Sequence, residues 1–416
     1  IFYNLGINAP IYASLVAVTL FNIGTAVLLY LIVGRILNKE AGLLSAFLWL
    51  FNPYVLFVSF IGLESSAQIF FMALLTYVLL TRSDRAQFSL KDSIIIGLIV
   101  GLVFLSRMDG VFIGFGVVTA LFIRKLVKRN FKISLFDLAK QKDLILISVT
   151  ALIIITPWLL WSYVELGRVT PISGEATHLL AASNLGDKSY IGLVKHSIYS
   201  TMGFIAKFFL NTADTTIQGI IVVSLAMLPF AILLLKKDRV LLKLIYSLDF
   251  LAIGAITLYL FYWFYQLGIR EWYSMFTSFL LTITFSITVV KLSRLFEPVK
   301  VGKVLSGAII CILSLSFIVG GATHYIRGNF PQEKLKWEVA NFIDDNIPQT
   351  EIIGSFNTGV YQYYTVNHDV INLDGVMNPE SLAAMKATGI ENYILSKNIT
   401  YIVDRPYYAE QVNKSI

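Results

Sequence analysis

The sequence predicts a polytopic α-helical membrane protein with a small C-terminal α/β domain on one side of the bilayer. Long apolar runs alternate with short basic segments from Ala9 to Gly321, and the rest of the chain has the composition of a soluble domain. Hydrophobic residues make up 56% of the chain and charged residues only 14%, whereas about a quarter of the residues of a soluble protein are charged. This layout restricts the function to transport, lipid-linked chemistry or signalling.

The formal net charge of +7 comes largely from lysines and arginines in the short loops between apolar runs. This is the positive-inside pattern of membrane proteins, in which basic loops face the cytoplasm. The predicted partners are therefore membrane lipids and not nucleic acid. The only cysteine, Cys311, lies within an apolar run, so an intramolecular disulfide is excluded.

The first three apolar runs each approach the roughly 20 residues that a transmembrane helix needs. The second run contains Asn52-Pro53, which predicts a bend or a break because proline removes a helical hydrogen bond and clashes with the preceding turn. Glu64 stands at the start of the third run. The three runs are Ala9–Val33, Ala41–Phe60 and Ser65–Thr81.

The next two runs, Ile94–Ser106 and Val111–Ile123, are each short for a complete span. The charged turn Arg107-Met108-Asp109-Gly110 lies between them. Irregular backbone is tolerated at membrane depth only where protein or water covers it. The pair therefore predicts two half-length helices that meet at a wet cavity below the outer surface.

Five further runs complete a membrane domain of about ten visible segments. The basic segment Arg124–Lys142 is the strongest cytoplasmic marker, and the long loop Glu165–Thr215 is predicted to hold an interfacial helix near Tyr190–Phe209. If every run crosses the membrane, the basic loops all fall on one side and the C-terminal domain falls on the other. The five runs are Leu144–Tyr163, Thr216–Leu235, Leu244–Phe264, Trp272–Val290 and Leu305–Gly321.

Residues 1–322 are predicted to form the membrane domain and residues 323–416 the soluble domain. The soluble part begins with an amphipathic helix over Glu333–Asp345, in which Leu335, Val339, Phe342 and Ile343 form an apolar stripe. Alternating elements follow and predict a small α/β domain. The expected strands are Glu351–Phe356, Asp369–Leu373 and Ile399–Val403, and the expected helices are Pro379–Thr388 and Glu391–Lys397.

Ionisable groups at the edges of the spans are few, and such groups are functional candidates because they are costly near lipid. They are Glu64, Arg107, Asp109, Arg270 and Glu271, all on the predicted outer side. A carboxylate can accept the proton of a hydroxyl nucleophile. The planar donor fork of arginine suits a phosphate group, and fixed positive charge stabilises a phosphate that leaves.

Three motifs resemble the GT-C superfamily of membrane glycosyltransferases, with the terminal arabinofuranosyltransferases and the dolichyl-phosphate-mannose protein mannosyltransferases as the nearest groups. The motifs are Gly62-Leu63-Glu64-Ser65-Ser66, Leu105-Ser106-Arg107-Met108-Asp109-Gly110 and Ile371-Asn372-Leu373-Asp374-Gly375. The resemblance covers nearly the whole chain in layout. It implies transfer of a sugar from a polyprenyl-phosphate carrier to a hydroxyl of a glycan, lipid or protein, on the outer face of the plasma membrane. It implies no cofactor, because the lipid-linked sugar is itself the substrate.

The resemblance also implies that the catalytic base is an Asp in the first outer loop, directly after the first span. This chain opens on Ile1, beyond the expected position of that loop. We therefore expect an N-terminally truncated sequence in which the first span and most of the first outer loop are missing. The fragment is then not expected to carry a complete catalytic centre.

Among the residues present, Glu64 and Asp109 are the predicted catalytic residues, and Arg107 and Arg270 the predicted ligands of the donor phosphate. Glu271, Tyr273 and Asp374 are assigned to the acceptor side of the cavity. No metal is predicted, because no paired-carboxylate or His-x-x-His motif is present.

Each assignment has a structural alternative. Glu64 fits a carboxylate favoured by the dipole at a helix N-terminus, and Arg107 with Asp109 fits a buried ion pair. Arg270 fits an interfacial anchor beside an aromatic belt. Asp374 fits a turn residue at the end of a strand.

A transporter or flippase of lipid-linked glycans is the alternative function. It explains the spans, but it explains neither an outer α/β domain nor ionisable groups gathered on one side. Transporters place polar residues near the bilayer midplane on several helices, and this sequence has few. A scaffold or sensor leaves Glu64 and Arg107 without a role.

Overall fold

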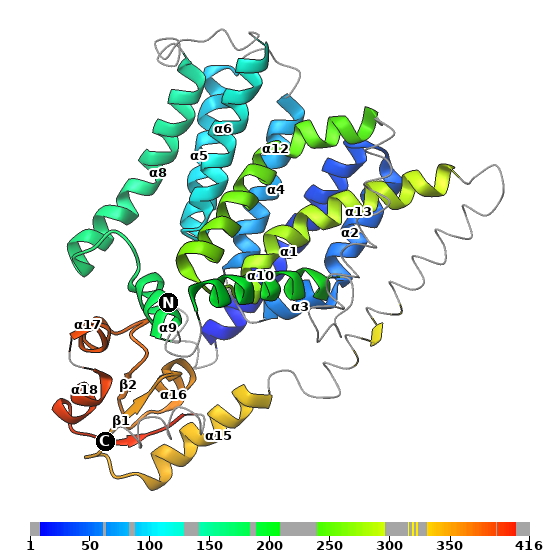
Figure 1. Cartoon of the computed structure of the whole chain (residues 1–416). Helices are drawn as coiled ribbons and strands as arrows, with labels where there is room; N and C mark the ends of the chain where they lie inside the picture. The colour runs from blue at the N-terminus through cyan, green and yellow to red at the C-terminus, as the bar shows by residue number, and fades with distance from the viewer. Residues whose placement is uncertain are drawn as a thin grey trace. The chain divides into compact units, whose positions relative to one another are not determined.

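The structure is a computed structural model of the chain (Figure 1). It describes residues 9–60, 64–82, 88–128, 141–183, 189–208, 239–295, 331–387 and 389–404, together with Leu315, Ile318, Val319 and Ala322. The predicted span Thr216–Leu235 and nearly all of Leu305–Gly321 lie outside these residues.

The chain divides into two compact units. The first comprises Ile1–Gly167, Val194–Tyr265 and Ile269–Gly321, and the second comprises Arg168–Leu193, Gln266–Gly268 and Ala322–Ile416. The second unit therefore takes in a part of the long loop after residue 165 as well as the C-terminal segment. The predicted domain limits at residues 322 and 323 stay a prediction.

The first unit is a bundle of long helices, which Figure 1 shows with α4, α5, α6 and α12 side by side. Among the described residues, six helices are long and apolar enough to cross a membrane. These helices confirm the predicted polytopic helical fold. Its elements are α1 (Ala9–Ile36), α2 (Lys39–Phe51), α3 (Pro53–Phe60), α4 (Ser65–Arg82), α5 (Leu90–Ser106), α6 (Gly110–Lys128), α8 (Lys142–Leu166), α10 (Tyr190–Lys207), α12 (Arg239–Leu260), a π-helical turn (Phe261–Gln266), a 3₁₀ turn (Glu271–Ser274) and α13 (Met275–Leu295).

The predicted break at Asn52-Pro53 is confirmed, since α2 and α3 meet there at an angle of 51°. Proline suits the first position of a helix, where its missing N–H costs nothing. The Asn52 Oδ1 atom accepts the N–H groups of Tyr54 at 2.9 Å and Val55 at 3.3 Å, and thereby caps α3. The Nδ2 of the same side chain donates to the carbonyl of Phe208, directly after α10, at 2.8 Å. One asparagine thus ends α2, starts α3 and holds the end of α10.

The prediction of a half-length helix over Val111–Ile123 was wrong. Helix α6 continues to Lys128, and its apolar part, Gly110–Val127, is long enough to span. The basic residues that suggested a helix end are paired instead. Arg124 Nε lies 2.7 Å from Asp249 of α12, and Lys125 pairs with Asp143 of α8.

Three ion pairs join neighbouring helices at the ends that the basic loops predict to be cytoplasmic. Their carboxylates lie in the first turns of helices, where negative charge is favoured, and their cations lie near helix C-termini. This arrangement agrees with the positive-inside pattern. The pairs are Arg82–Asp92 (α4 to α5), Lys125–Asp143 (α6 to α8) and Arg294–Glu40 (α13 to α2).

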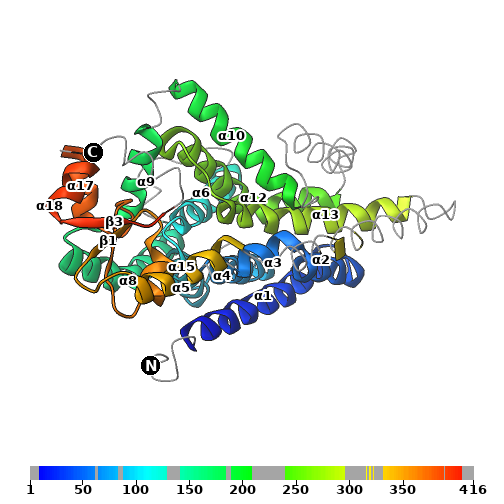
Figure 2. The same cartoon turned by 90° about the horizontal axis from the view of Figure 1, so that it is seen from below.

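The helix predicted near Tyr190–Phe209 is confirmed as α10, which runs across the long helices of its unit in Figures 1 and 2. Two contacts fix it in addition to the bond from Asn52. Trp263 Nε1 donates to Thr201 Oγ1 at 2.9 Å, and Lys207 pairs with Glu271 at 2.8 Å.

The C-terminal part of the second unit is the predicted α/β structure. Its three strands are all parallel, in the order β2-β1-β3, and each predicted strand and helix is confirmed to within a few residues. Only the helix after β1 was not predicted. The elements are α15 (Pro331–Asn346), β1 (Ile352–Ser355), α16 (Thr358–Tyr364), β2 (Val370–Asn372), α17 (Pro379–Ala387), α18 (Ile390–Ser396) and β3 (Ile399–Ile402).

The apolar stripe predicted on α15 was partly wrong. Ile343 is fully buried, but Leu335 and Phe342 are each 59% exposed. The buried face is rotated toward Ala340, which is also fully buried, and the core of this part includes Ile353 of β1. The stripe missed Ala340 because a small residue carries little hydrophobic signal.

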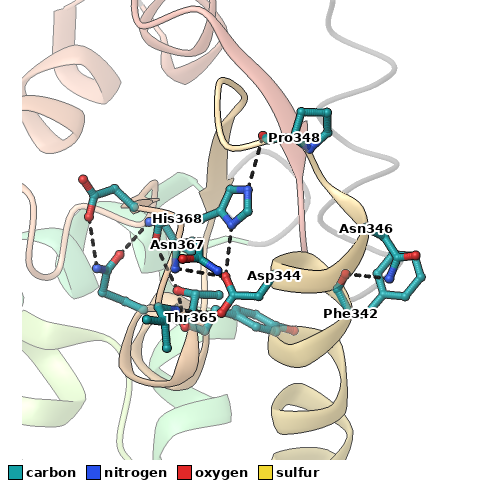
Figure 3. Close-up of polar contacts among 12 residues, drawn as sticks. Phe342, Asp344, Asn346, Pro348, Thr365, Asn367 and His368 are labelled. Carbon is teal, nitrogen blue, oxygen red and sulfur yellow. Dashed lines mark hydrogen bonds and ion pairs between the residues drawn. The ribbon is translucent and has the colours of Figure 1, made fainter.

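His368, in the loop before β2, ties that loop to the end of α15 (Figure 3). Its Nδ1 lies 3.1 Å from Asp344 Oδ1, and its Nε2 lies 3.3 Å from the carbonyl of Pro348. Asp344 also accepts the N–H groups of Val366 at 2.7 Å and Asn367 at 3.2 Å. Both ring nitrogens thus face acceptors, an arrangement that the doubly protonated imidazolium satisfies.

A helix from the long loop, α9 (Ile172–Ser183), belongs to the same unit. Its Glu175 pairs with Lys386 of α17 and, at 3.0 Å, with Arg168. Gln266 Nε2 donates to the carbonyl of Gly174 at 2.8 Å. The loop and the C-terminal domain are therefore joined by side-chain contacts within one unit.

Candidate active site

The turn between α5 and α6 places two charged side chains together. Helix α5 ends because Arg107 has extended backbone angles, with φ −157° and ψ 138°. The N–H of Gly110 donates to the carbonyl of Arg107 at 2.9 Å. A Cβ at Gly110 would lie 2.5 Å from the carbonyl oxygen of Val103, so only glycine fits this close approach. The tight turn leaves Arg107 Nε 3.3 Å from each carboxylate oxygen of Asp109.

Arg107 also reaches the start of α4. Its Nη1 lies 2.6 Å from Glu64 Oε1 and 3.4 Å from Ser65 Oγ. The arginine side chain is 9% exposed and that of Asp109 8%, whereas that of Glu64 is 51% exposed. The structure therefore brings together three predicted residues, with one carboxylate buried and the other open to solvent.

Gln68 was missed by the sequence analysis. Its Nε2 donates to Asp109 Oδ1 at 2.6 Å, so Asp109 is held by both Gln68 and Arg107. The available signal was its spacing from Glu64, since residues four apart lie on the same face of a helix. With two fixed partners, Asp109 is suited to orient Arg107.

Tyr273 lies on the other side of Arg107. The guanidinium carbon is 5.1 Å from the centre of the Tyr273 ring, within the range of a cation–π interaction. The Tyr273 ring in turn lies 4.1 Å from that of Tyr262, centre to centre. Tyr262 belongs to the π-helical turn, a distortion frequent at functional sites. Tyr273 therefore lies beside Arg107, its assignment to the acceptor side stays a prediction, and Tyr262 is an unpredicted neighbour.

Among the described residues, no side-chain hydrogen bond or ion pair joins Arg270 or Glu271 to Glu64, Arg107 or Asp109. Glu271 pairs with Lys207 of α10, and its carbonyl accepts the hydroxyl of Tyr54 at 2.6 Å. Arg270 is exposed, and within the described part of the chain no hydrogen bond or ion pair joins it to Arg107 or Glu64. Asp374 belongs to the second unit, where it accepts the N–H of Val376 at 2.8 Å.

The cluster of Glu64, Arg107 and Asp109 carries two carboxylates and one cation. An anionic ligand of Arg107 would compete with these carboxylates for the guanidinium N–H groups. Glu64 is the one to move because it is half exposed, whereas Asp109 is buried and held by Gln68. Asp109 thus holds Arg107 firmly, whereas the bond to Glu64 can be replaced by a bond to another anion.

A multi-helix bundle with this charged cluster at the ends of its helices has the layout that the GT-C resemblance predicts. Residues 2–161 match the family model described as dolichyl-phosphate-mannose-protein mannosyltransferase, and this match confirms the GT-C resemblance. The matched segment contains Glu64, Gln68, Arg107 and Asp109. Residues 324–414 match a domain of unknown function (DUF8728). No curated protein matches the chain.

Proposed function

We propose that the protein transfers a sugar from a polyprenyl-phosphate carrier to a hydroxyl group of a glycan, lipid or protein. The reaction is assigned to the extracytoplasmic face of the plasma membrane. The observation that carries the proposal is the placement of Arg107 between a buried and an exposed carboxylate, inside the segment that matches the mannosyltransferase family.

Donor binding is assigned to Arg107, whose planar fork forms bidentate bonds with phosphate. Asp109 and the Tyr273 ring keep the guanidinium in place from two sides. The donor phosphate takes over the bond that Arg107 makes with Glu64. Glu64 is thereby released only when donor is bound.

Among the residues of this chain the released Glu64 is assigned as the proton acceptor, beside the Asp that the resemblance places in the first outer loop. The acceptor hydroxyl oxygen attacks the anomeric carbon, and the bond from that carbon to the phosphate oxygen breaks. The electron pair leaves with the polyprenyl phosphate, whose charge Arg107 stabilises. The hydroxyl proton passes to Glu64.

Two further residues receive supporting roles. Arg270, exposed beside the 3₁₀ turn, is proposed as a second contact of the lipid-linked phosphate. Glu271 holds that turn through Lys207 and is assigned to the acceptor side.

The extracytoplasmic assignment draws on the charge distribution. The cationic helix ends pair at the opposite end of the helices from Arg107, and basic ends face the cytoplasm. The C-terminal domain shares a unit with the loop helix α9, which follows the outer end of α8 in the predicted topology. Both observations favour a C-terminal domain on the outer side.

The test uses the full-length protein in nanodiscs, with membranes from cells that lack the gene as acceptor. The donor panel is polyprenyl-phosphate-linked [¹⁴C]mannose, glucose and arabinose. Glu64→Gln and Arg107→Ala are expected to lower transfer strongly without loss of folded protein. Glu40→Gln and Arg124→Ala are the matched controls, because both residues form ion pairs at the other end of the bundle. Wild-type rates in both site variants would overturn the assignment.

The same preparation distinguishes sugar transfer from the alternative function, a flippase of lipid-linked glycans. A flippase moves labelled lipid-linked sugar between leaflets of a proteoliposome and leaves the phosphate–sugar bond intact. Label that changes leaflet but never leaves the lipid would favour transport.

A further inference from the structure

A buried polar network joins α1, α2, α3 and α4 next to the candidate site. Asn22 of α1 is at its centre. Its Nδ2 donates to Ser59 Oγ at 2.9 Å and to Ser66 Oγ at 3.3 Å, and its Oδ1 accepts from Trp49 Nε1 at 3.2 Å. Relative exposure is 8% for Asn22, 4% for Ser59, and 1% or less for Ser66 and Trp49.

The position of this network makes it costly unless every group is paired. Asn22 lies inside the apolar helix Pro10–Ile36, which is long enough to span a membrane. Polar side chains within a span are expensive and mark functional positions. Both the amide nitrogen and the amide oxygen of Asn22 have partners, and its Nδ2 also bonds the carbonyl of Val18 at 3.0 Å. A fully connected network of this kind specifies one arrangement of its helices.

The two serines connect the network to the site. Ser66 lies in the first turn of α4, directly after Ser65, which contacts Arg107. Ser59 lies at the other end of α3 from Tyr54, whose hydroxyl donates to the carbonyl of Glu271 at 2.6 Å. Helix α4 thus positions Glu64, and α3 supports the turn that carries Tyr273. Asn22 bonds both helices at once, and Ser66 also bonds Ser59 directly at 3.3 Å.

We propose that Asn22 is a positioning residue, which holds Glu64 opposite Arg107 by fixing the start of α4 against the end of α3. This inference rests on the proposed function. The fold does not depend on it alone, because the bond between Ser66 and Ser59 still joins α4 to α3 without the amide. Removing the Asn22 amide should therefore loosen the register of α4 more than it destabilises the bundle.

The test variant is Asn22→Leu, which keeps the volume and removes the bonds to Ser59, Ser66 and Trp49. Ser66→Ala is a milder second variant that removes the bonds of α4 to Asn22 and to Ser59 and keeps the other bonds of Asn22. Thr25→Val is the matched control. Thr25 is fully buried on the same helix, and its hydroxyl bonds the carbonyl of Phe21 in that helix at 2.8 Å.

Transfer is measured with the full-length protein and the donor panel above. Displacement of a reacting group by about 1 Å can cost about a hundredfold in rate, so we expect Asn22→Leu to lower transfer by about tenfold to a hundredfold. Ser66→Ala should lose less, and Thr25→Val should stay within about twofold. Thermal unfolding of each variant monitors the fold.

The decisive measurement is the double variant with Glu64→Gln. Residues that act through one another are not additive, so adding Asn22→Leu to Glu64→Gln should cost almost nothing further. If Asn22→Leu lowers the residual rate by the same factor as in the wild type, the positioning role is overturned. Wild-type transfer by Asn22→Leu would overturn it as well.

The Glu64→Gln single variant separates the two proposals. If it loses transfer while Asn22→Leu keeps it, the proposed function stands and the role of Asn22 falls. If Glu64→Gln itself transfers at the wild-type rate, the site assignment fails and the inference about Asn22 fails with it.

Discussion

Gln68 donates a 2.6 Å hydrogen bond to Asp109, and this contact fixes the carboxylate that holds Arg107. Asp109 is therefore bound by a neutral donor on α4 and a cationic donor on its own turn. The buried side of the cluster is rigid, which leaves the half-exposed Glu64 as its movable part.

Gln68→Leu should weaken donor binding more than it slows catalysis. A buried acceptor that loses its donor costs about 1–3 kcal/mol, and here Asp109 would then hold Arg107 less precisely. We expect the KM for the lipid-linked donor to rise roughly five- to fiftyfold with a smaller change in kcat. Initial rates over a donor series measure this split. An unchanged KM would show that Gln68 does not support Arg107.

Arg107→Lys should fail although it preserves the charge. An ammonium group on a flexible stem cannot reproduce the fork that contacts Glu64 and Asp109 together. We expect transfer to fall by at least about tenfold. Arg124→Lys, in the pair with Asp249 at the other end of the bundle, is the control and should change transfer by less than about twofold. Equal activity of Arg107→Lys and wild type would contradict a bidentate role.

The ring of Tyr273, and not its hydroxyl, is expected to matter for Arg107. The guanidinium lies 5.1 Å from the ring centre, and a cation–π contact contributes about 0.5–2 kcal/mol. Tyr273→Phe should therefore keep the donor KM within about twofold, whereas Tyr273→Leu should raise it by about two- to thirtyfold. Donor titrations of both variants decide the matter. A large loss in Tyr273→Phe would instead point to the hydroxyl.

The C-terminal domain should be most resistant to opening at mildly acidic pH. The hydrogen bond to Asp344 raises the pKa of His368 above its ordinary value, against the opposing effect of burial. Burial acts to raise the pKa of Asp344, but the N–H of Val366 and the bond to His368 lower it overall. The raised pKa of His368 stabilises the folded domain fully below about pH 6.5. This stabilisation is lost as the pH rises through the pKa of His368 in the folded state.

Asp344 sets the lower limit of the pH range in which the domain is most stable. The lowered pKa of Asp344 stabilises the folded domain above about pH 3.9. This stabilisation is lost as the pH falls through the pKa of Asp344 in the folded state. Hydrogen exchange of residues 331–404 in the full-length protein should therefore show the greatest protection between about pH 4 and 6.5. His368→Asn should flatten the decline above that range. A wild-type profile that rises from pH 6 to 8 would contradict the assignment.

The sequence predicted which groups share one side of the membrane, but not which of them touch. Glu64 and Arg107 are separated by 43 positions, and only the antiparallel packing of α4 and α5 brings them together. Lys207 was missed as the partner of Glu271 because the position of α10 depends on contacts with Asn52 and Trp263 that no local pattern reveals.

Charged residues near helix ends led to a wrong helix limit where a distant partner neutralises the charge. Arg124 suggested the end of a short helix, yet Asp249 pairs with it across 125 positions and α6 continues. The C-terminal strands were predictable because each is a short β-rich run between turn signals. Local sequence patterns therefore predicted the helices and strands. Contacts between residues far apart in the sequence determine which side chains form the site.

The double use of Asn52 has a consequence for biogenesis. Its Nδ2 finds the carbonyl of Phe208 only after a further 156 residues have been synthesised. At about 5–20 residues per second, this takes roughly 8–30 s. During that time a polar amide at the bend between two nascent membrane helices lacks its final acceptor. A pause in translation at this stage therefore prolongs the time for which the amide has no final acceptor in the membrane.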